Sequence, residues 1–167
     1  MSRRPVCRTT AGKWLLCGSL IATLLVLCFI FGNSLQDGER SMQTSGAVVE
    51  VVKPIVDPKD EIEDEIFSTI IRKLAHFTEF FWLGMAAFGV LIGASLQELR
   101  HRPTRSGVLL FLLLCAVADE FLQSFTGRTS SVRDVLIDFG GALSGLLLTY
   151  LAVRGVRWLC RKRCANK

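Results

Sequence analysis

The sequence lacks the patterns that mark the common hydrolases. It has only two histidines, His76 and His101, and neither a His-Glu-x-x-His nor a Gly-x-Ser-x-Gly arrangement, which excludes a zinc-protease helix and a nucleophile elbow. The long segment 32–73 contains no cysteine, which excludes a disulfide framework there. Cys160 and Cys164 are four residues apart without a second matching pair, so they do not indicate a structural zinc site.

Long apolar runs dominate the chain instead. Of the 167 residues, 50% are hydrophobic, and they concentrate in four runs near 14–31, 74–96, 106–125 and 135–153. A run of about 20 apolar residues crosses a bilayer as a helix, because a helix satisfies its own backbone groups in hydrocarbon. The first run is longer than the ~7–15 residues of a signal-peptide core, which favours a retained span. We therefore predict an all-α fold, a four-span transmembrane helical bundle that forms a single membrane domain over 1–167.

The segments between these runs differ in charge. Most of the 20 Lys and Arg residues lie at the N-terminus, between the second and third runs, and in the C-terminal tail, whereas most of the 15 acids lie in segment 32–73. Lys and Arg concentrate on the cytoplasmic side of membrane proteins. We predict that both termini are cytoplasmic, together with Cys7, Cys160 and Cys164, and that segment 32–73 is an extracytoplasmic loop. The net charge of +5 reflects these flanks, which suit anionic lipid heads, and it does not indicate nucleic acid as a partner.

Segment 32–73 is long for a connection in a compact bundle. In its second half, Asp57 is a candidate helix cap, with Pro58 at the first helical position and acids in the early turns. Apolar residues such as Ile62 and Phe67 then recur at helical spacing. We predict an amphipathic helix that begins near Pro58, lies on the extracytoplasmic face and runs into span two.

Ionisable residues occur in spans two to four, but only near one end of each span. Arg72, His76 and Glu79 are spaced by four and three residues, so they share one helix face. Isolated ionisable groups at bilayer depth cost at least a few kcal/mol each, so they indicate a functional polar site with internal partners. The predicted orientation places them all at the outer-leaflet end. The candidate polar site comprises Arg72, Lys73, His76, Glu79, Asp119, Glu120, Gln123, Arg128, Asp134 and Asp138, with Arg133 beside them.

These residues fall into spaced motifs. The motifs are Arg72-Lys73-x-x-His76-x-x-Glu79, Asp119-Glu120-x-x-Gln123, Gly127-Arg128 and Asp134-x-x-x-Asp138-x-x-Gly141, preceded by Ser34 and Gly38. In this order and spacing they resemble the VanZ-like family of small bacterial integral membrane proteins, and the resemblance covers residues 33–148. It implies a multi-pass protein of the bacterial cytoplasmic membrane and cell envelope. It also implies a link to antibiotic resistance, through glycopeptide (teicoplanin) susceptibility or the handling of wall precursors, but no established reaction.

Four interpretations of the polar site remain open. It can be purely structural, with arginines pairing carboxylates between helices. It can be a membrane-embedded hydrolase that uses acid–base chemistry or a divalent metal, for which the candidate ligands are His76, Glu79, Asp119 and Glu120. It can bind an anionic lipid or lipid-linked wall precursor through its Lys and Arg residues, or it can belong to an ion-coupled carrier. We predict no cofactor other than a divalent metal, and no partner beyond the lipid bilayer and such an anionic ligand.

Overall fold

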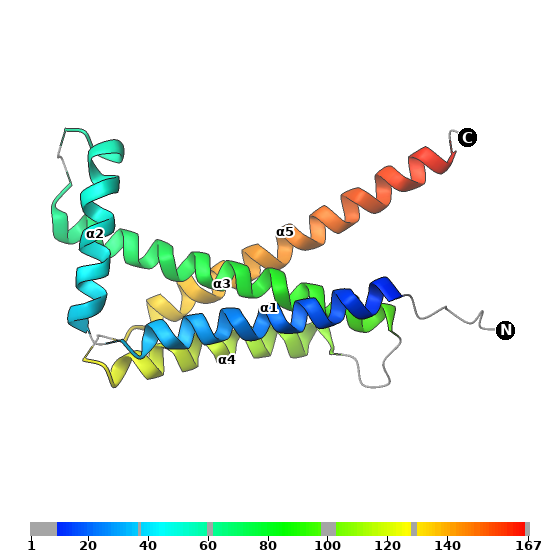
Figure 1. Ribbon diagram of the computed structural model, residues 1–167, viewed down its shortest axis with the longest axis horizontal. Helices are drawn as coiled ribbons and strands as arrows, with labels where there is room; N and C mark the ends of the chain where they lie inside the picture. Colours follow the sequence, from blue (N-terminus) through cyan, green and yellow to red (C-terminus); the bar gives the residue numbers. More distant parts are fainter. Residues whose placement is uncertain (1–9, 37, 60–61, 98–102, 128–129, 166–167) are drawn as a thin grey trace.

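The computed structural model describes residues 10–36, 38–59, 62–97, 103–127 and 130–165. Over these residues, all of the regular secondary structure is α-helical. The helices are α1 (Thr10–Ser34), α2 (Gly38–Val56), α3 (Asp64–Leu96), α4 (Arg105–Ser124) and α5 (Val132–Ala165). α1, α3 and α4 run alongside one another, α5 crosses α3 and then leaves the bundle, and α2 lies across one end (Figure 1). The predicted all-α fold is confirmed.

Four of these helices are long and apolar enough to cross a membrane: α1, α3, α4 and residues 132–163 of α5. They coincide with the four predicted spans. Their outward faces carry many large apolar side chains, and Leu24, Leu110, Phe121 and Leu136 are each more than half exposed. In water such a surface would favour aggregation, whereas lipid tails solvate it as well as another helix would. The chain is therefore a multi-pass membrane protein.

Glycines allow the spans to approach closely. A Cβ atom added to Gly141 or Gly145 of α5 would collide with the backbone oxygens of Phe77 and Phe81 on α3. Gly89 and Gly93 of α3 are in equally close contact with α1. Lipid provides no hydrophobic force that pushes helices together, so such contacts supply much of the packing energy. Both pairs have the spacing of four that is typical of close helix contacts in membranes.

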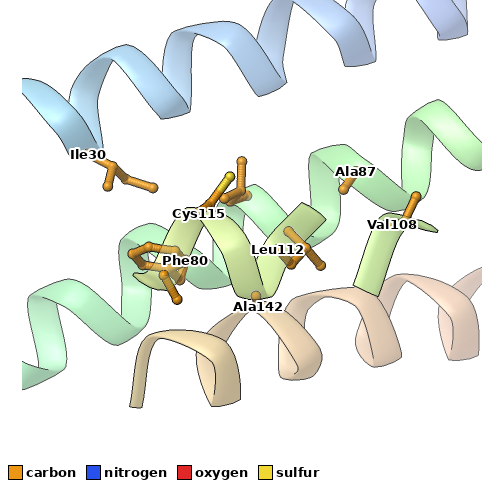
Figure 2. Packing of buried hydrophobic residues seen from close by; sticks show 9 residues of the cluster. Ile30, Phe80, Ala87, Val108, Leu112, Cys115 and Ala142 are labelled. Carbon is orange, nitrogen blue, oxygen red and sulfur yellow. The ribbon is translucent and has the colours of Figure 1, made fainter. Parts of the chain in front are cut away.

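The apolar core lies between all four spans (Figure 2). It contains Ile30, Phe80, Leu83, Ala87, Val108, Leu112, Cys115, Ala116 and Ala142. Large side chains such as Phe80 and Leu112 are combined with alanines, which lets the helices interdigitate at the density of protein interiors. Phe80 directly follows Glu79, and Cys115 precedes Asp119 by one helical turn. The polar residues therefore begin where the apolar core ends.

The connection between α1 and α3 differs from the predicted one. Asp57 and Pro58 lie in a turn, in which Asp57 Oδ2 accepts a hydrogen bond from the Ile62 backbone N–H at 2.7 Å, and α3 begins only at Asp64. The prediction of a helix start at Pro58 was therefore wrong, because the Asp57 carboxylate closes a turn instead of capping a helix. The helix that precedes span two is α2, in the first half of the segment. From Asp64 onward, α3 runs without a break into the span.

α2 presents different faces to the bundle and to its surroundings. Lys53 is largely buried and pairs with Asp64 at the start of α3. Val48, Val51 and Ile55 recur at helical spacing on an exposed stripe. An apolar stripe on a helix that lies across the end of a bundle suits a position in the membrane interface. That α2 is extracytoplasmic remains a prediction.

Candidate polar site at one end of the bundle

Polar side chains from all four spans gather at the end of the bundle where α2 lies. The end of α1, the first half of α3, the end of α4 and the start of α5 meet there, because successive spans run in opposite directions (Figure 1). The buried polar residues that the spans contribute to this end are Ser34, Asp119, Glu120, Gln123 and Asp138, and Lys53 and Asp57 are buried at the end of α2. Buried polar groups need hydrogen-bond partners, so the partners of each group define what the site can do.

Asp119 is the centre of a hydrogen-bond network. Its carboxylate is fully buried and accepts hydrogen bonds from the Ser34 hydroxyl on α1 and, at 2.7 Å, from Gln123 Nε2 on its own helix. His76 Nδ1 on α3 lies 3.6 Å from Asp119 Oδ2. Three helices therefore meet at one carboxylate. Removing a donor would leave a buried charge less well compensated, which is costly in a dry site.

Two glutamates hold neighbouring elements in place. Glu79 Oε1 accepts a hydrogen bond from Asn33 Nδ2 at 2.9 Å, which ties α3 to the end of α1. Glu120 Oε2 accepts a hydrogen bond from the Ser131 backbone N–H at 2.9 Å, which holds the segment before α5 against α4. Glu79 therefore connects two helices whose bonded residues are 46 positions apart, whereas Glu120 connects α4 to the segment that directly follows it.

Asp138 is buried without comparable support. Its side chain is 1% exposed, and within the described part of the chain neither of its carboxyl oxygens accepts a hydrogen bond. One potential ligand atom from each of His76, Asp119 and Asp138 lies within 4.8 Å of the others. A buried carboxylate without donors is costly unless a cation or a proton accompanies it. An imidazole and two carboxylates form a donor set that suits Zn²⁺ or Mn²⁺.

Lys73 and Asp134 form an ion pair at the rim of this group. The Lys73 Nζ and Asp134 Oδ1 atoms are 3.0 Å apart, and the two side chains are 39% and 27% exposed. Lys73 lies about one helical turn before His76 on α3, and Asp134 lies one turn before Asp138 on α5. A pair this exposed contributes only about 0–1 kcal/mol to stability. Its position therefore matters more than its strength, since it places a partly exposed ammonium group about one helical turn from the buried residues.

The remaining predicted cations are placed differently. Arg72 lines a hollow of about 820 Å³ between α2 and the start of α3. It shares that lining with Lys53 and with four carboxylates, Glu50, Asp57, Asp64 and Glu65, a balance that does not favour an anion there. Arg133 is exposed at the start of α5. Arg128 lies outside the described residues.

The predicted set omits Asn33 and Ser34. Each donates a hydrogen bond to a carboxylate on another helix, and Ser34 is fully buried. In the sequence they are small polar residues at the end of an apolar run, where such residues usually indicate only a turn. The sequence feature that indicates a role for Ser34 is its place in the motif pattern. Its partner is 85 positions away along the chain, so local spacing does not reveal the contact.

A bundle of four spans with a buried polar network at one end defines a polytopic membrane protein with an intramembrane polar site. A family model described as VanZ/LLP1 matches residues 19–153, a region that includes every member of that network. The chain therefore belongs to the VanZ/LLP1 family, which confirms the resemblance carried by its motifs. No protein of curated function and no solved structure matches it.

Proposed function

We propose that this protein works at the outer leaflet of the bacterial cytoplasmic membrane, where it binds the phosphate-bearing headgroup of an anionic envelope lipid or lipid-linked wall precursor with the help of a divalent cation. In the cell this binding alters teicoplanin susceptibility, because glycopeptides act on wall precursors. The observation that carries the proposal is the buried carboxylate of Asp138, which accepts no hydrogen bond within the described part of the chain and lies beside His76 and Asp119.

Electrostatics explains why a cation belongs in the proposal. The described site holds the carboxyl groups of Glu79, Asp119, Glu120 and Asp138, so by itself it would repel a phosphate. A divalent ion between His76, Asp119 and Asp138 would offset two negative charges. Three protein ligands leave further coordination positions on such an ion, and phosphate oxygens can fill them.

Lys73 supplies the second attraction. Its partly exposed ammonium group lies about one turn outward from His76, on the path from the end of the bundle to the buried group. A headgroup that arrives from the leaflet would meet this ammonium first, and the ion pair with Asp134 would hold the lysine in position until then.

The test uses purified full-length protein, ZnCl₂ or MnCl₂, and a polyprenyl phosphate as the lipid probe. Wild type is expected to bind one metal ion per chain and to capture the lipid only when metal is present. Asp138→Asn should lose both the metal and the lipid. The matched control is Asp134→Asn, which makes the same change one turn away and should keep the metal.

Two further variants locate the lipid. Lys73→Gln should keep the metal but bind the lipid about fivefold more weakly, since one basic residue beside an anionic headgroup contributes about 1 kcal/mol. The matched control is Lys13→Gln, which makes the same change at an exposed lysine of α1 at the other end of the bundle and should bind the lipid normally. If Asp138→Asn stays folded and retains both metal and lipid, the proposal is refuted and the network is structural. In cells, Asp138→Asn should change teicoplanin susceptibility more than Asp134→Asn does, because Asp134→Asn keeps the metal.

The same metal group favours a second candidate function, metal-dependent hydrolysis of the bound phosphoester. A metal ion at His76, Asp119 and Asp138 would activate a bound water molecule for attack on phosphorus, and the leaving oxygen would depart with a proton. Incubation with a polyprenyl pyrophosphate decides between the two functions. Metal-dependent release of phosphate that Asp138→Asn abolishes would support hydrolysis, whereas capture without release would leave binding as the function.

A further inference from the structure

A second polar feature lies at the opposite end of the bundle and carries the opposite charge. A cavity of about 860 Å³ is bounded there by the end of α3, the start of α4 and the second half of α5. Four arginines line it: Arg105, Arg154, Arg157 and Arg161. Among the described residues, no carboxylate lines the cavity, and none lies within 4.0 Å of these guanidinium groups. The cavity, called the arginine groove below, therefore favours an anion.

The walls of the arginine groove are apolar and aromatic. Phe88 and Leu91 of α3 contribute to one wall, and Tyr150 and Trp158 of α5 contribute to another. The Tyr150 ring stands edge-on to Phe88, with 6.1 Å between ring centroids, and its hydroxyl accepts a hydrogen bond from Arg154 Nη1 at 3.0 Å. Trp and Tyr are enriched where a membrane meets water. This combination fits a ligand with both a charged and an apolar part.

The position of the groove indicates which ligand that is. α5 crosses α3 and then departs from the other helices (Figure 1), and the groove is lined by residues of α3 and α5 in the region where they separate. Leu147 and Leu151, just before the arginines on α5, are each more than half exposed and face the surroundings of the bundle. A soluble anion would use the guanidinium groups alone, whereas acyl chains would also cover this apolar surface.

We infer that the arginine groove binds an anionic phospholipid of the leaflet at this end of the bundle. The phosphate lies among the guanidinium groups, which recognise phosphate oxygens through paired N–H donors. The acyl chains lie along α3 and α5. Basic pockets between membrane helices are suited to such headgroups. This inference concerns the end of the bundle opposite to the proposed headgroup site and does not depend on it.

The test is a lipid titration of delipidated full-length protein in detergent, followed by native mass spectrometry and by the midpoint of thermal unfolding. Dioleoyl-phosphatidylglycerol should bind and raise the midpoint, and dioleoyl-phosphatidylcholine should do neither. Each basic residue near an anionic headgroup contributes about a fivefold gain in affinity. Arg105→Gln with Arg157→Gln should therefore weaken phosphatidylglycerol binding about 25-fold, and Arg157→Lys should largely retain it.

The matched control is Arg133→Gln, which removes an exposed arginine from the other end of α5 and should leave binding unchanged. Lys73→Gln should also leave it unchanged, which separates this site from the proposed outer one. Equal binding of phosphatidylcholine, an unaffected double variant or an equal loss in Arg133→Gln would overturn the inference. Competition by glycerol 3-phosphate at the concentration of the lipid would also overturn it, because the groove would then bind a free phosphate. All four arginines are exposed, so the single variants Arg105→Gln and Arg157→Gln should fold. If the double variant does not fold, these single variants replace it in the titration.

Discussion

Gly141→Ala is the most direct test of how Asp138 comes to lie beside His76. A Cβ atom at Gly141 would collide with the backbone oxygen of Phe77, the residue that follows His76, and this oxygen can move only if α3 and α5 separate. Overpacking of this kind costs about 1–3 kcal/mol, and the better helix propensity of alanine returns up to about 1 kcal/mol. The expected net loss of about 0–2 kcal/mol corresponds to a change of up to about 30-fold in the unfolding equilibrium.

The adjacent Gly140 provides the control. A Cβ atom there meets nothing within 4 Å, so Gly140→Ala should be neutral or about 0.5–1 kcal/mol more stable. Unfolding is followed by tryptophan fluorescence as sodium dodecyl sulfate is added to the protein in mild detergent, and metal binding is measured in parallel. Gly141→Ala should be the less stable variant and should bind metal more weakly. If the two variants are equally stable, α3 and α5 do not touch at Gly141, and the placement of Asp138 beside His76 is refuted.

Three further predictions concern the site and the orientation. In EDTA, Asp138→Asn should be as stable as wild type or up to about 1 kcal/mol more stable, because it removes a buried carboxylate to which none of the described residues donates a hydrogen bond. Zn²⁺ at 100 times its Kd should stabilise wild type alone by about 2.7 kcal/mol. Stabilisation of both proteins by Zn²⁺ would contradict this. Ser34→Ala should lower the stability by about 1–3 kcal/mol, since it removes a buried hydrogen-bond donor to Asp119. The control is Ser95→Ala, which removes an exposed hydroxyl that bonds within its own helix and should change the stability by less than about 0.5 kcal/mol. Equal stabilities of the two variants in the same unfolding assay would show that the Ser34–Asp119 hydrogen bond is unimportant. Cys160 is a free, exposed thiol, and in a chain whose other cysteines are serines it should react with an impermeant maleimide only after cells are permeabilised; labelling of intact cells would reverse the predicted orientation.

Local properties of the sequence are sufficient to predict much of the fold. The four spans follow from the length of each apolar run, because hydrocarbon imposes the same requirement on any such run. The hydrogen bond between Gln123 and Asp119 agrees with their spacing of four residues, which places both side chains on the same face of one helix. The spacing of four between Gly141 and Gly145 is typical of a close helix contact whichever helix is the partner. In each case the evidence lies within one or two helical turns.

The connection before α3 shows where local evidence was ambiguous. Asp57 followed by Pro58 is equally compatible with a helix cap and with a turn, and the side chain closes a turn through the Ile62 backbone N–H. In the structure with this turn, Lys53 of α2 is buried against the start of α3 and pairs with Asp64. A helix cap depends on one residue and its neighbours, whereas the turn observed here is accompanied by contacts between α2 and α3.

What the sequence determined by itself is that the chain crosses a membrane four times and gathers its ionisable residues near one end of each span. Only the tertiary structure decided which of those residues meet. It joined Ser34 to Asp119 and Asn33 to Glu79, and it placed four arginines around a groove where α5 leaves α3. It also buried Asp138 where none of the described residues donates a hydrogen bond to it. The physical reason is that a side chain's depth in the membrane depends on its own helix, whereas its partners depend on how neighbouring helices are rotated and how closely they pack.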